Sequence, residues 1–172
     1  TTTDLVTETD EKCDRVIIER LRQDFPDFDI ISEETFNTVS ELSNNATWII
    51  DPIDGTTNFV HGNPAVAVSI GLTFNKQCIL GVIVLPMYKE TYVAIKGQGA
   101  YKTDIHHDQP FKISVSSNVT LDSTLSLLSS NFPYARSDEA LNPVLSRYNM
   151  LLRTGVRGIR GSGSACVNLV QV

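Results

Sequence analysis

Apolar and polar residues alternate along the chain with two different periods, and each period predicts a different kind of element. Residues 10–25 place apolar side chains every four positions, at Cys13, Ile17, Leu21 and Phe25, with charged residues between them. Because an α-helix completes a turn in about 3.6 residues, this spacing predicts an amphipathic helix with one apolar face.

Residues with known capping preferences mark the ends of this helix. Thr7 or Thr9 can cap its start through the hydroxyl, and Pro26 follows its end. We expect Lys12 and Asp14 to lie on the side of the helix that faces water.

The middle of the chain is rich in predicted strands. From Val66 to Phe74 apolar residues occupy every second position, and Asn75-Lys76 then provides a hairpin turn. The run from Ile79 to Leu85 is apolar throughout and is expected to be covered on both faces, and a third strand runs from Thr91 to Ile95. Consecutive strands joined by short turns predict an antiparallel meander.

Shorter apolar stretches predict further elements on either side of this meander. The pair Ile30-Ile31 precedes a Ser-Glu-Glu segment, and Trp48–Ile50 is typical of a short buried strand that ends at Asp51-Pro52. Residues 35–46 are polar and are expected to form a loop. Towards the C-terminus we expect a strand over Thr124–Leu128, a helix over residues 137–153 and a helix that opens at Ser162–Ser164. This order of elements predicts mixed α and β layers.

Composition narrows the classes of protein to which the chain can belong. Its 172 residues are 41% hydrophobic and 20% charged, which is ordinary for a globular protein with a real core. The net charge of −6 argues against a nucleic-acid or membrane-surface binder, and no apolar run reaches the ~20 residues that cross a bilayer. Cys13, Cys78 and Cys166 lie far apart in the sequence, which fits a reducing, cytoplasmic compartment. No secretory leader is visible, and an organellar location stays open.

The strongest chemical signal is the string Asp51-Pro-Ile-Asp54-Gly-Thr56, which follows the apolar Trp48–Ile50 run. Its two acids face the start of a helix of about two turns that Thr56 can open. Carboxylate oxygens suit Mg²⁺, and the N–H groups at a helix start suit a phosphate. If Glu33 joins them, the acids repel by about 4 kcal/mol for each pair 4 Å apart and require cations. Taken alone, the same string is also compatible with a polar surface turn.

Four stretches of the chain resemble the inositol monophosphatase family in order and spacing. WIIDPIDGTTNFVHG (48–62) is similar to the family's first signature, and DLVTETD (4–10) to its N-terminal motif. IISEET (30–35) resembles its G-E-E segment with Ser32 in place of the usual glycine, and RGSGSACVNL (160–169) resembles the first half of its second signature. The resemblance covers nearly the whole chain and is specific for the family, although not for one substrate.

The resemblance implies a phosphomonoesterase that hydrolyses a small phosphorylated polyol with about two or three Mg²⁺ ions. Glu33, Asp51 and the carbonyl of Ile53 are implied to hold the first ion, and Asp51 and Asp54 to share the second. The hydroxyl of Thr56, paired with Asp10, is implied to activate the attacking water. The implied substrate contacts are Glu33, Ile53, Asp54, Gly55, Thr56, Gly163, Ser164 and Ala165, and among these Gly55 and Thr56 offer backbone N–H groups to the phosphate.

The same resemblance implies the layered α-β-α-β-α sandwich of the sugar phosphatases, an α/β (α+β) fold. Residues 1–120 would form an N-terminal α+β part with the metal site, and residues 121–172 would begin a C-terminal α/β part. The family's second signature continues to a Trp-Asp pair that completes the second metal site. The chain ends before such a pair, so we expect an incomplete second part and weak or absent activity. Family members are commonly homodimers.

The substrate stays open among several relatives' choices. An inositol monophosphate is the first hypothesis, with no nucleic-acid or membrane partner. Another sugar phosphate, histidinol phosphate or a 3′-phosphorylated nucleotide would use the same chemistry, and residues near Phe132–Arg136 are expected to bear on the choice. A non-catalytic interaction protein that kept the fold is a further alternative. The joint presence of Asp10, Glu33, Asp51, Asp54 and Thr56 argues against it.

Other conspicuous residues are expected to be structural. The segment Gly97–Ala100 lacks the third glycine of a phosphate-binding loop and is expected to form a hairpin turn. The three histidines, His61, His106 and His107, have no catalytic spacing and are expected at the surface or in turns. We expect Cys166 to pack in the interior rather than to react.

Overall fold

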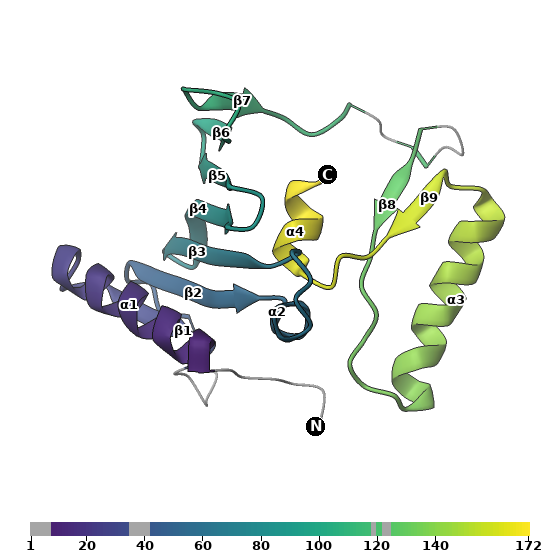
Figure 1. The fold of residues 1–172 in the computed structure, drawn as a ribbon, viewed down its shortest axis with the longest axis horizontal. Helices are drawn as coiled ribbons and strands as arrows, with labels where there is room; N and C mark the ends of the chain where they lie inside the picture. Colours follow the sequence, from purple (N-terminus) through teal and green to yellow (C-terminus); the bar gives the residue numbers. More distant parts are fainter. Residues whose placement is uncertain (1–7, 35–41, 118–119, 122–124) are drawn as a thin grey trace.

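The computed structural model describes residues 8–34, 42–117, 120–121 and 125–172 (Figure 1). Its elements, in chain order, are α1 (Glu8–Asp24), β1 (Asp29–Ser32), β2 (Thr47–Asp54), α2 (Thr56–Val60), β3 (Ala67–Phe74), β4 (Gln77–Leu85), β5 (Glu90–Ile95), β6 (Gly99–Thr103), β7 (Phe111–Ile113), β8 (Leu127–Ser129), α3 (Asp138–Thr154), β9 (Gly158–Arg160) and α4 (Ala165–Val170). Two expectations from the sequence, a cap at Thr7 and a loop over 35–41, fall outside the described residues.

Seven strands form one sheet in the order β1-β2-β3-β4-β5-β6-β7. β1 pairs with β2 in parallel, and each later pair is antiparallel. Asn75 and Lys76 join β3 to β4 with φ values of 50° and 60°, and two positive φ values are what the commonest two-residue hairpin turn requires. The antiparallel meander and its hairpin are therefore confirmed, and Gly97 lies in the turn between β5 and β6 as expected.

β2 is longer than the sequence predicts, and this difference shapes the site. The strand runs on to Asp54 instead of ending at Asp51-Pro52. Its register against β3 shifts between Asp51 and Asp54, so the ladder is interrupted there. A proline, which has no N–H to donate, fits such an irregularity without breaking the strand. β4 also differs from expectation, because most of its residues are half-buried rather than covered on both faces.

α1 packs on one face of the sheet with Ile18 buried, and the ring of Phe25, just after the helix, lies 5.3 Å from the ring of Trp48. The helix predicted over 10–25 is confirmed, but the prediction that Asp14 faces water is wrong. Asp14 is only 3% exposed, and its carboxylate accepts a hydrogen bond from the hydroxyl of Ser32 on β1. A buried carboxylate persists where a neighbouring strand supplies a donor, which hydrophobic periodicity does not reveal.

The other face of the sheet packs against α4. Side chains of β3 and β4, with Ala65 before them, form a small core with Val167 of α4, and partly buried residues including Tyr92 and Cys166 surround it. Side chains alternate between the two faces of a strand. The register therefore places one row of residues on this face, and the row crosses five strands from β2 to β6. The row consists of Asp51, Ser69, Ile83, Tyr92 and Lys102.

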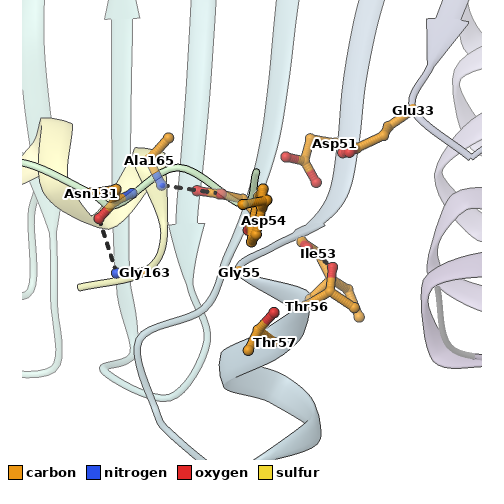
Figure 2. Close-up of a pocket in the computed structure, with 11 residues that line it drawn as sticks. Glu33, Asp51, Ile53, Asp54, Gly55, Thr56, Thr57, Asn131, Gly163 and Ala165 are labelled. Carbon is orange, nitrogen blue, oxygen red and sulfur yellow. Dashed lines mark hydrogen bonds between the residues drawn. The ribbon is translucent and has the colours of Figure 1, made fainter. Parts of the chain in front are cut away.

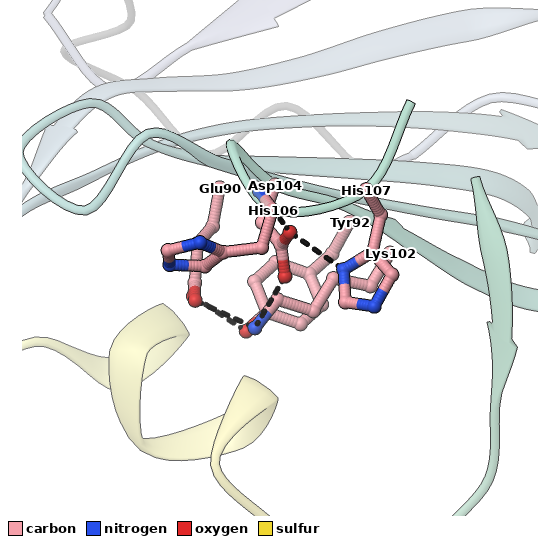
Figure 3. A network of polar contacts seen from close by, with 6 residues as sticks. All are labelled: Glu90, Tyr92, Lys102, Asp104, His106 and His107. Carbon is pink, nitrogen blue, oxygen red and sulfur yellow. Dashed lines mark hydrogen bonds and ion pairs between the residues drawn. The ribbon is translucent and has the colours of Figure 1, made fainter. Parts of the chain in front are cut away.

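The far end of this row carries a network of charged side chains (Figure 3). The ammonium of Lys102 lies 2.6 Å from Glu90 and 3.7 Å from Asp104. Tyr92 donates a hydrogen bond of 2.8 Å to the second oxygen of Glu90, and Nδ1 of His107 lies 2.8 Å from Asp104. We call these five residues, Glu90, Tyr92, Lys102, Asp104 and His107, the charged network.

The C-terminal part forms a second, smaller layer. β8 and β9 pair in parallel, and α3 connects them along the chain. In Figure 1, α4 lies between the large sheet and this pair, and α3 covers the far side. The order of layers matches the α-β-α-β-α sandwich expected from the resemblance, and the helix expected over 137–153 is confirmed. The strand expected over Thr124–Leu128 lies at 127–129, and residues 122–124 are outside the described residues.

Candidate active site

A pocket of about 250 Å³ opens where β2 ends, between α2 and the segment that precedes α4 (Figure 2). Eight residues expected from the sequence line it together: Glu33, Asp51, Ile53, Asp54, Gly55, Thr56, Gly163 and Ala165. They come from three stretches separated by up to about 130 residues of chain. The structure thus brings the expected residues to one place, which a surface turn at Asp51–Thr56 alone does not require.

Gly55 makes the turn from β2 into α2. Its φ of 94° lies in the left-handed region, where glycine is favoured. A Cβ at this position would lie 3.0 Å from the carbonyl oxygen of Ala65 and 3.1 Å from Cβ of Ser164. The close approach packs the Asp54-Gly55 turn directly against the segment that begins α4. α2 is a single short turn of helix, shorter than the two turns expected.

Asp51 is a half-buried carboxylate with an unusual charge environment. One of its oxygens, Oδ1, is buried and has no hydrogen-bond partner among the described residues. Burial, then the charge of Glu33 and then that of Asp54, raises the pKa of Asp51 from an ordinary 3.8 to about 7. Among the described residues that line the pocket, none carries a positive charge that could offset these acids.

Asp54 is held differently, because the start of α4 surrounds it. Its carboxylate accepts hydrogen bonds from the Ser164 hydroxyl at 2.6 Å, from the Cys166 N–H at 2.6 Å and from the Ala165 N–H at 3.2 Å. A carboxylate has about four lone-pair positions, so Asp54 keeps one on Oδ1. Ser164 itself is fully buried and does not line the pocket, so it acts on the site through Asp54 and is not placed to touch a substrate.

Thr56 and Asp10 meet at the other side of the Asp51–Thr56 segment. The hydroxyl of Thr56 lies 3.1 Å from the carbonyl oxygen of Ile53 and 3.5 Å from Oδ1 of Asp10. Asp10 is 1% exposed, on the buried side of α1. The pairing of these two residues, expected from the resemblance, is present as a long contact.

A divalent cation is implied by the resemblance, and the residues present fit one. No three His, Cys, Asp or Glu side chains of the described residues are already gathered as a ligand cage. Figure 2 shows that Glu33 and Asp51 point toward each other, whereas Asp54 is turned to α4. The unpartnered oxygen of Asp51, the facing carboxylate of Glu33 and the carbonyl of Ile53 are hard oxygen donors, which Mg²⁺ prefers.

Sequence reasoning gave no role to two residues that line the pocket, Thr57 and Asn131, whereas a third, Tyr134, lies in the Phe132–Arg136 stretch expected to bear on substrate choice. Asn131 follows β8 in a segment without a motif, so no spacing rule identifies it. A second cavity of about 390 Å³ shares these residues and extends to Arg136. The expectation that residues 132–136 bear on substrate choice is consistent with their position beside the pocket.

Other residues set aside from the sequence have structural positions. Burial, and then the charge of Asp54, raises the pKa of Cys166 to about 12, so its thiol stays protonated near neutral pH and is a poor nucleophile. The three cysteines are free. No described helix has the length and apolar character that a membrane span requires.

Comparisons with known proteins identify the family of the chain. The profile of the inositol monophosphatase family matches residues 1–172. Inositol monophosphatase 1 of Sus scrofa is 41% identical over 171 residues, which are 98% of this chain and 59% of that protein, and the Homo sapiens protein is 40% identical over the same shares.

Solved structures show the same fold. The extragenic suppressor protein suhB from Bartonella henselae matches with a TM-score of 0.84 and 30% identity, over 100% of this chain and 63% of that one. The inositol monophosphatase from Anabaena matches with a TM-score of 0.78 and 34% identity, over 97% and 62%. The chain spans about three-fifths of the length of the relatives it matches. It belongs to the inositol monophosphatase family.

Proposed function

We propose that the protein is a Mg²⁺-dependent phosphomonoesterase that hydrolyses an inositol monophosphate. The observation that carries the proposal is the pair of facing carboxylates, Glu33 and Asp51, with a buried oxygen of Asp51 that no described donor satisfies. A cation stabilises two carboxylates that face each other, and carboxylate oxygens prefer a hard cation such as Mg²⁺. Relatives named inositol monophosphatase at about 40% identity support the substrate class.

In this proposal Glu33, Asp51 and the carbonyl of Ile53 would hold one ion, and Asp51 and Asp54 would help to hold a second. Two such ions supply Lewis-acid activation of water and neutralise charge on the transferred phosphoryl group and the leaving oxygen. Asp54 contributes with its remaining lone pair, because α4 occupies the others. The hydrogen bonds from α4 fix the carboxylate in orientation before any ligand arrives.

Thr56 and Asp10 are proposed to accept the proton that the attacking water loses. When the Thr56 hydroxyl donates to Asp10, its oxygen lone pairs are free to accept a hydrogen bond from a water in the pocket. As Thr56 accepts a proton from the water, it would pass its own hydroxyl proton to the buried carboxylate of Asp10. The backbone N–H groups of Gly55 and Thr56 are proposed to receive the phosphate, with Gly163 and Ala165 beside the alcohol part of the substrate.

The test is phosphate release from myo-inositol 1-phosphate, with and without Mg²⁺, by the chain and by any longer natural form of it. Histidinol phosphate and adenosine 3′,5′-bisphosphate serve as alternative substrates. Hydrolysis of the inositol ester that requires Mg²⁺ and is lost in Asp51→Asn supports the proposal. Faster hydrolysis of another ester would change the proposed substrate but not the proposed reaction. Absence of any Mg²⁺-dependent thermal stabilisation would favour a non-catalytic protein.

The homodimeric state and a cytoplasmic location belong to the same proposal. Free cysteines are compatible with a reducing compartment, and light scattering of the purified protein tests the oligomeric state.

A further inference from the structure

The segment Gly161–Ser164, between β9 and α4, is held by asparagine side chains from three different elements. Asn58 of α2 donates to the carbonyl of Ser162 at 2.7 Å and to that of Ala65 at 2.7 Å. Asn168 of α4 accepts from the N–H of Ser162 at 3.1 Å. Asn131, after β8, accepts from the N–H of Gly163 at 3.2 Å and from Nδ2 of Asn168 at 2.7 Å (Figure 2 shows the first of these). We call Asn58, Asn131 and Asn168 the amide clamp.

The clamp fixes both backbone polar groups of Ser162 and one of Gly163. Gly163 also packs directly on Asn58, since a Cβ there would lie 2.9 Å from both Nδ2 and Oδ1 of that side chain. The segment has two glycines, which make it intrinsically adaptable, so side-chain contacts have to define its position. Through the clamp, α2 and the segment 104 residues away are joined by one side chain.

The position of this segment decides how Asp54 is held. Ser164 and Ala165 donate to the carboxylate of Asp54, and Gly163 and Ala165 line the pocket. A shift of the segment would therefore release Asp54 and change the shape of the pocket together. The clamp uses neutral amides, so it adds no charge that would compete with a bound cation or phosphate.

We propose that Asn58, Asn131 and Asn168 are positioning residues that hold the Gly161–Ser164 segment, and through it Asp54, in the arrangement that the metal site requires. The inference rests on the proposed function, because it concerns the affinity of that site for Mg²⁺. The donors and acceptors of the clamp give it a specific signature. Asn58 acts only as a donor here, whereas Asn131 acts only as an acceptor.

This difference makes asparagine-to-aspartate substitutions informative. In Asn58→Asp a carboxylate would face two carbonyl oxygens that now accept hydrogen bonds, so the clamp would open. In Asn131→Asp both accepted N–H groups keep an acceptor, so the clamp would remain closed. Added negative charge near the site would by itself strengthen cation binding. A loss of Mg²⁺ affinity in Asn58→Asp therefore cannot come from charge and reports the lost positioning.

The experiment is calorimetric titration of Mg²⁺ into the wild-type chain and its variants, at a temperature where circular dichroism shows them folded. We expect Asn58→Asp to lower the affinity about 10- to 100-fold, the usual effect of losing a residue that orients a ligand. Asn131→Asp should bind at least as tightly as the wild type, and Asn131→Leu should bind more weakly. Asn63→Asp is the matched control, because Asn63 follows α2 and, among the described contacts, its side chain only accepts a hydrogen bond, from the N–H of Ala65 at 3.0 Å.

Hydrogen exchange gives a second readout that does not depend on metal. Amides of residues 161–168 should exchange faster in Asn58→Asp than in Asn63→Asp, while those of α1 stay unchanged. Equal Mg²⁺ affinity and equal exchange in Asn58→Asp and wild type would overturn the clamp and leave the proposed function intact. A wild-type chain that binds no Mg²⁺ would instead overturn the proposed function, and the clamp's role in it as well. If Asn58→Asp does not fold, hydrogen exchange of residues 161–168 without metal decides the question, because it should be faster in Asn131→Leu than in Asn131→Asp.

Discussion

Two groups of acidic side chains lie at opposite ends of one row of residues across the sheet, and they are built in opposite ways. At one end Asp51 faces Glu33 in a pocket that Asp54 also lines, and no described lining residue is cationic. At the other end the charged network gives each carboxylate a partner, since Lys102 lies between Glu90 and Asp104 and His107 lies beside Asp104.

The titration of the two groups reflects this difference. The pKa of Asp104 is lowered, chiefly by its hydrogen bond with His107, whereas the pKa of Asp51 is raised to about 7 by burial and by neighbouring acids. A carboxylate that is paired with a positive side chain within the fold has no need of a cation from solution. A carboxylate kept without countercharge is unfavourable for folding, and it makes chemical sense only where a cation from solution completes it.

The largest effect should come from removing the uncompensated acid. Asp51→Asn removes a proposed metal ligand, so we expect Mg²⁺ affinity to fall by more than about 100-fold, beyond what the loss of an orienting residue causes. Wild-type protein should gain about 2.7 kcal/mol of stability when Mg²⁺ is at 100 times its dissociation constant, and the variant should gain almost none. Urea unfolding with and without Mg²⁺ measures both.

The same experiment on the charged network shows whether the contrast is real. Lys102→Met should keep the full stabilisation by Mg²⁺, because Glu90 and Asp104, the partners of Lys102, do not line the pocket. Loss of that stabilisation in Lys102→Met would contradict the division into two groups.

Two glycines with positive φ differ in their surroundings, because only one of them is packed against other residues. Gly163 has a φ of 86° and would clash with Asn58 if it carried a Cβ, whereas Gly97 has a φ of 78° and nothing within 4 Å. Gly163→Ala should therefore lower the free energy of unfolding by roughly 1–3 kcal/mol, and Gly97→Ala by about 1 kcal/mol from backbone strain alone. Chemical denaturation gives both values. Equal losses of stability would mean that the Gly161–Ser164 segment shifts to accommodate the Cβ without additional strain.

Removing the cation of the charged network should have a smaller effect. Lys102→Met leaves Glu90 and Asp104 without their shared ammonium, and because Lys102 and Glu90 retain about a fifth to a quarter of their side-chain exposure, water partly compensates. We expect a loss of roughly 1–2 kcal/mol, below the cost of breaking a fully buried pair. Lys96→Met is the control, since Lys96 is exposed and bonds only the neutral amide of Gln77 among the described contacts. A thermal melt in which the two variants match would show that the network adds no stability.

The sequence predicted the acid pocket far better than it predicted what surrounds it. Asp51 and Asp54 lie in a motif whose residue types and spacing carry chemistry, and the resemblance to the family added Glu33 and Thr56. Asn131 carries no such signal, because its role depends on a meeting with residues 163 and 168 that only the fold creates.

The fold shows the same limit. Periods of two and of about four residues were enough for the meander and for α1, since both reflect which side chains avoid water. They could not show that Asp14 is buried against Ser32, or that β2 continues through Pro52, because both depend on contacts between segments. The division near residue 120 stays a prediction.

A pH dependence of opposite sign at the two ends of the row is the most direct comparison. Asp51 has a raised pKa, so without Mg²⁺ the folded state loses stability as pH rises from about 3.8 to about 7 and regains it on acidification. Asp104 has a lowered pKa, so its contribution is complete above about 3.8 and is lost as pH falls further. Urea unfolding of metal-free protein should thus show a rise between pH 7 and pH 4.5 that is absent in Asp51→Asn. Saturating Mg²⁺ should suppress the same rise, because the cation favours the ionised carboxylate that acid removes. If the stability of the metal-free wild type and that of Asp51→Asn change equally between pH 7 and pH 4.5, a positive charge within the protein must already neutralise Asp51.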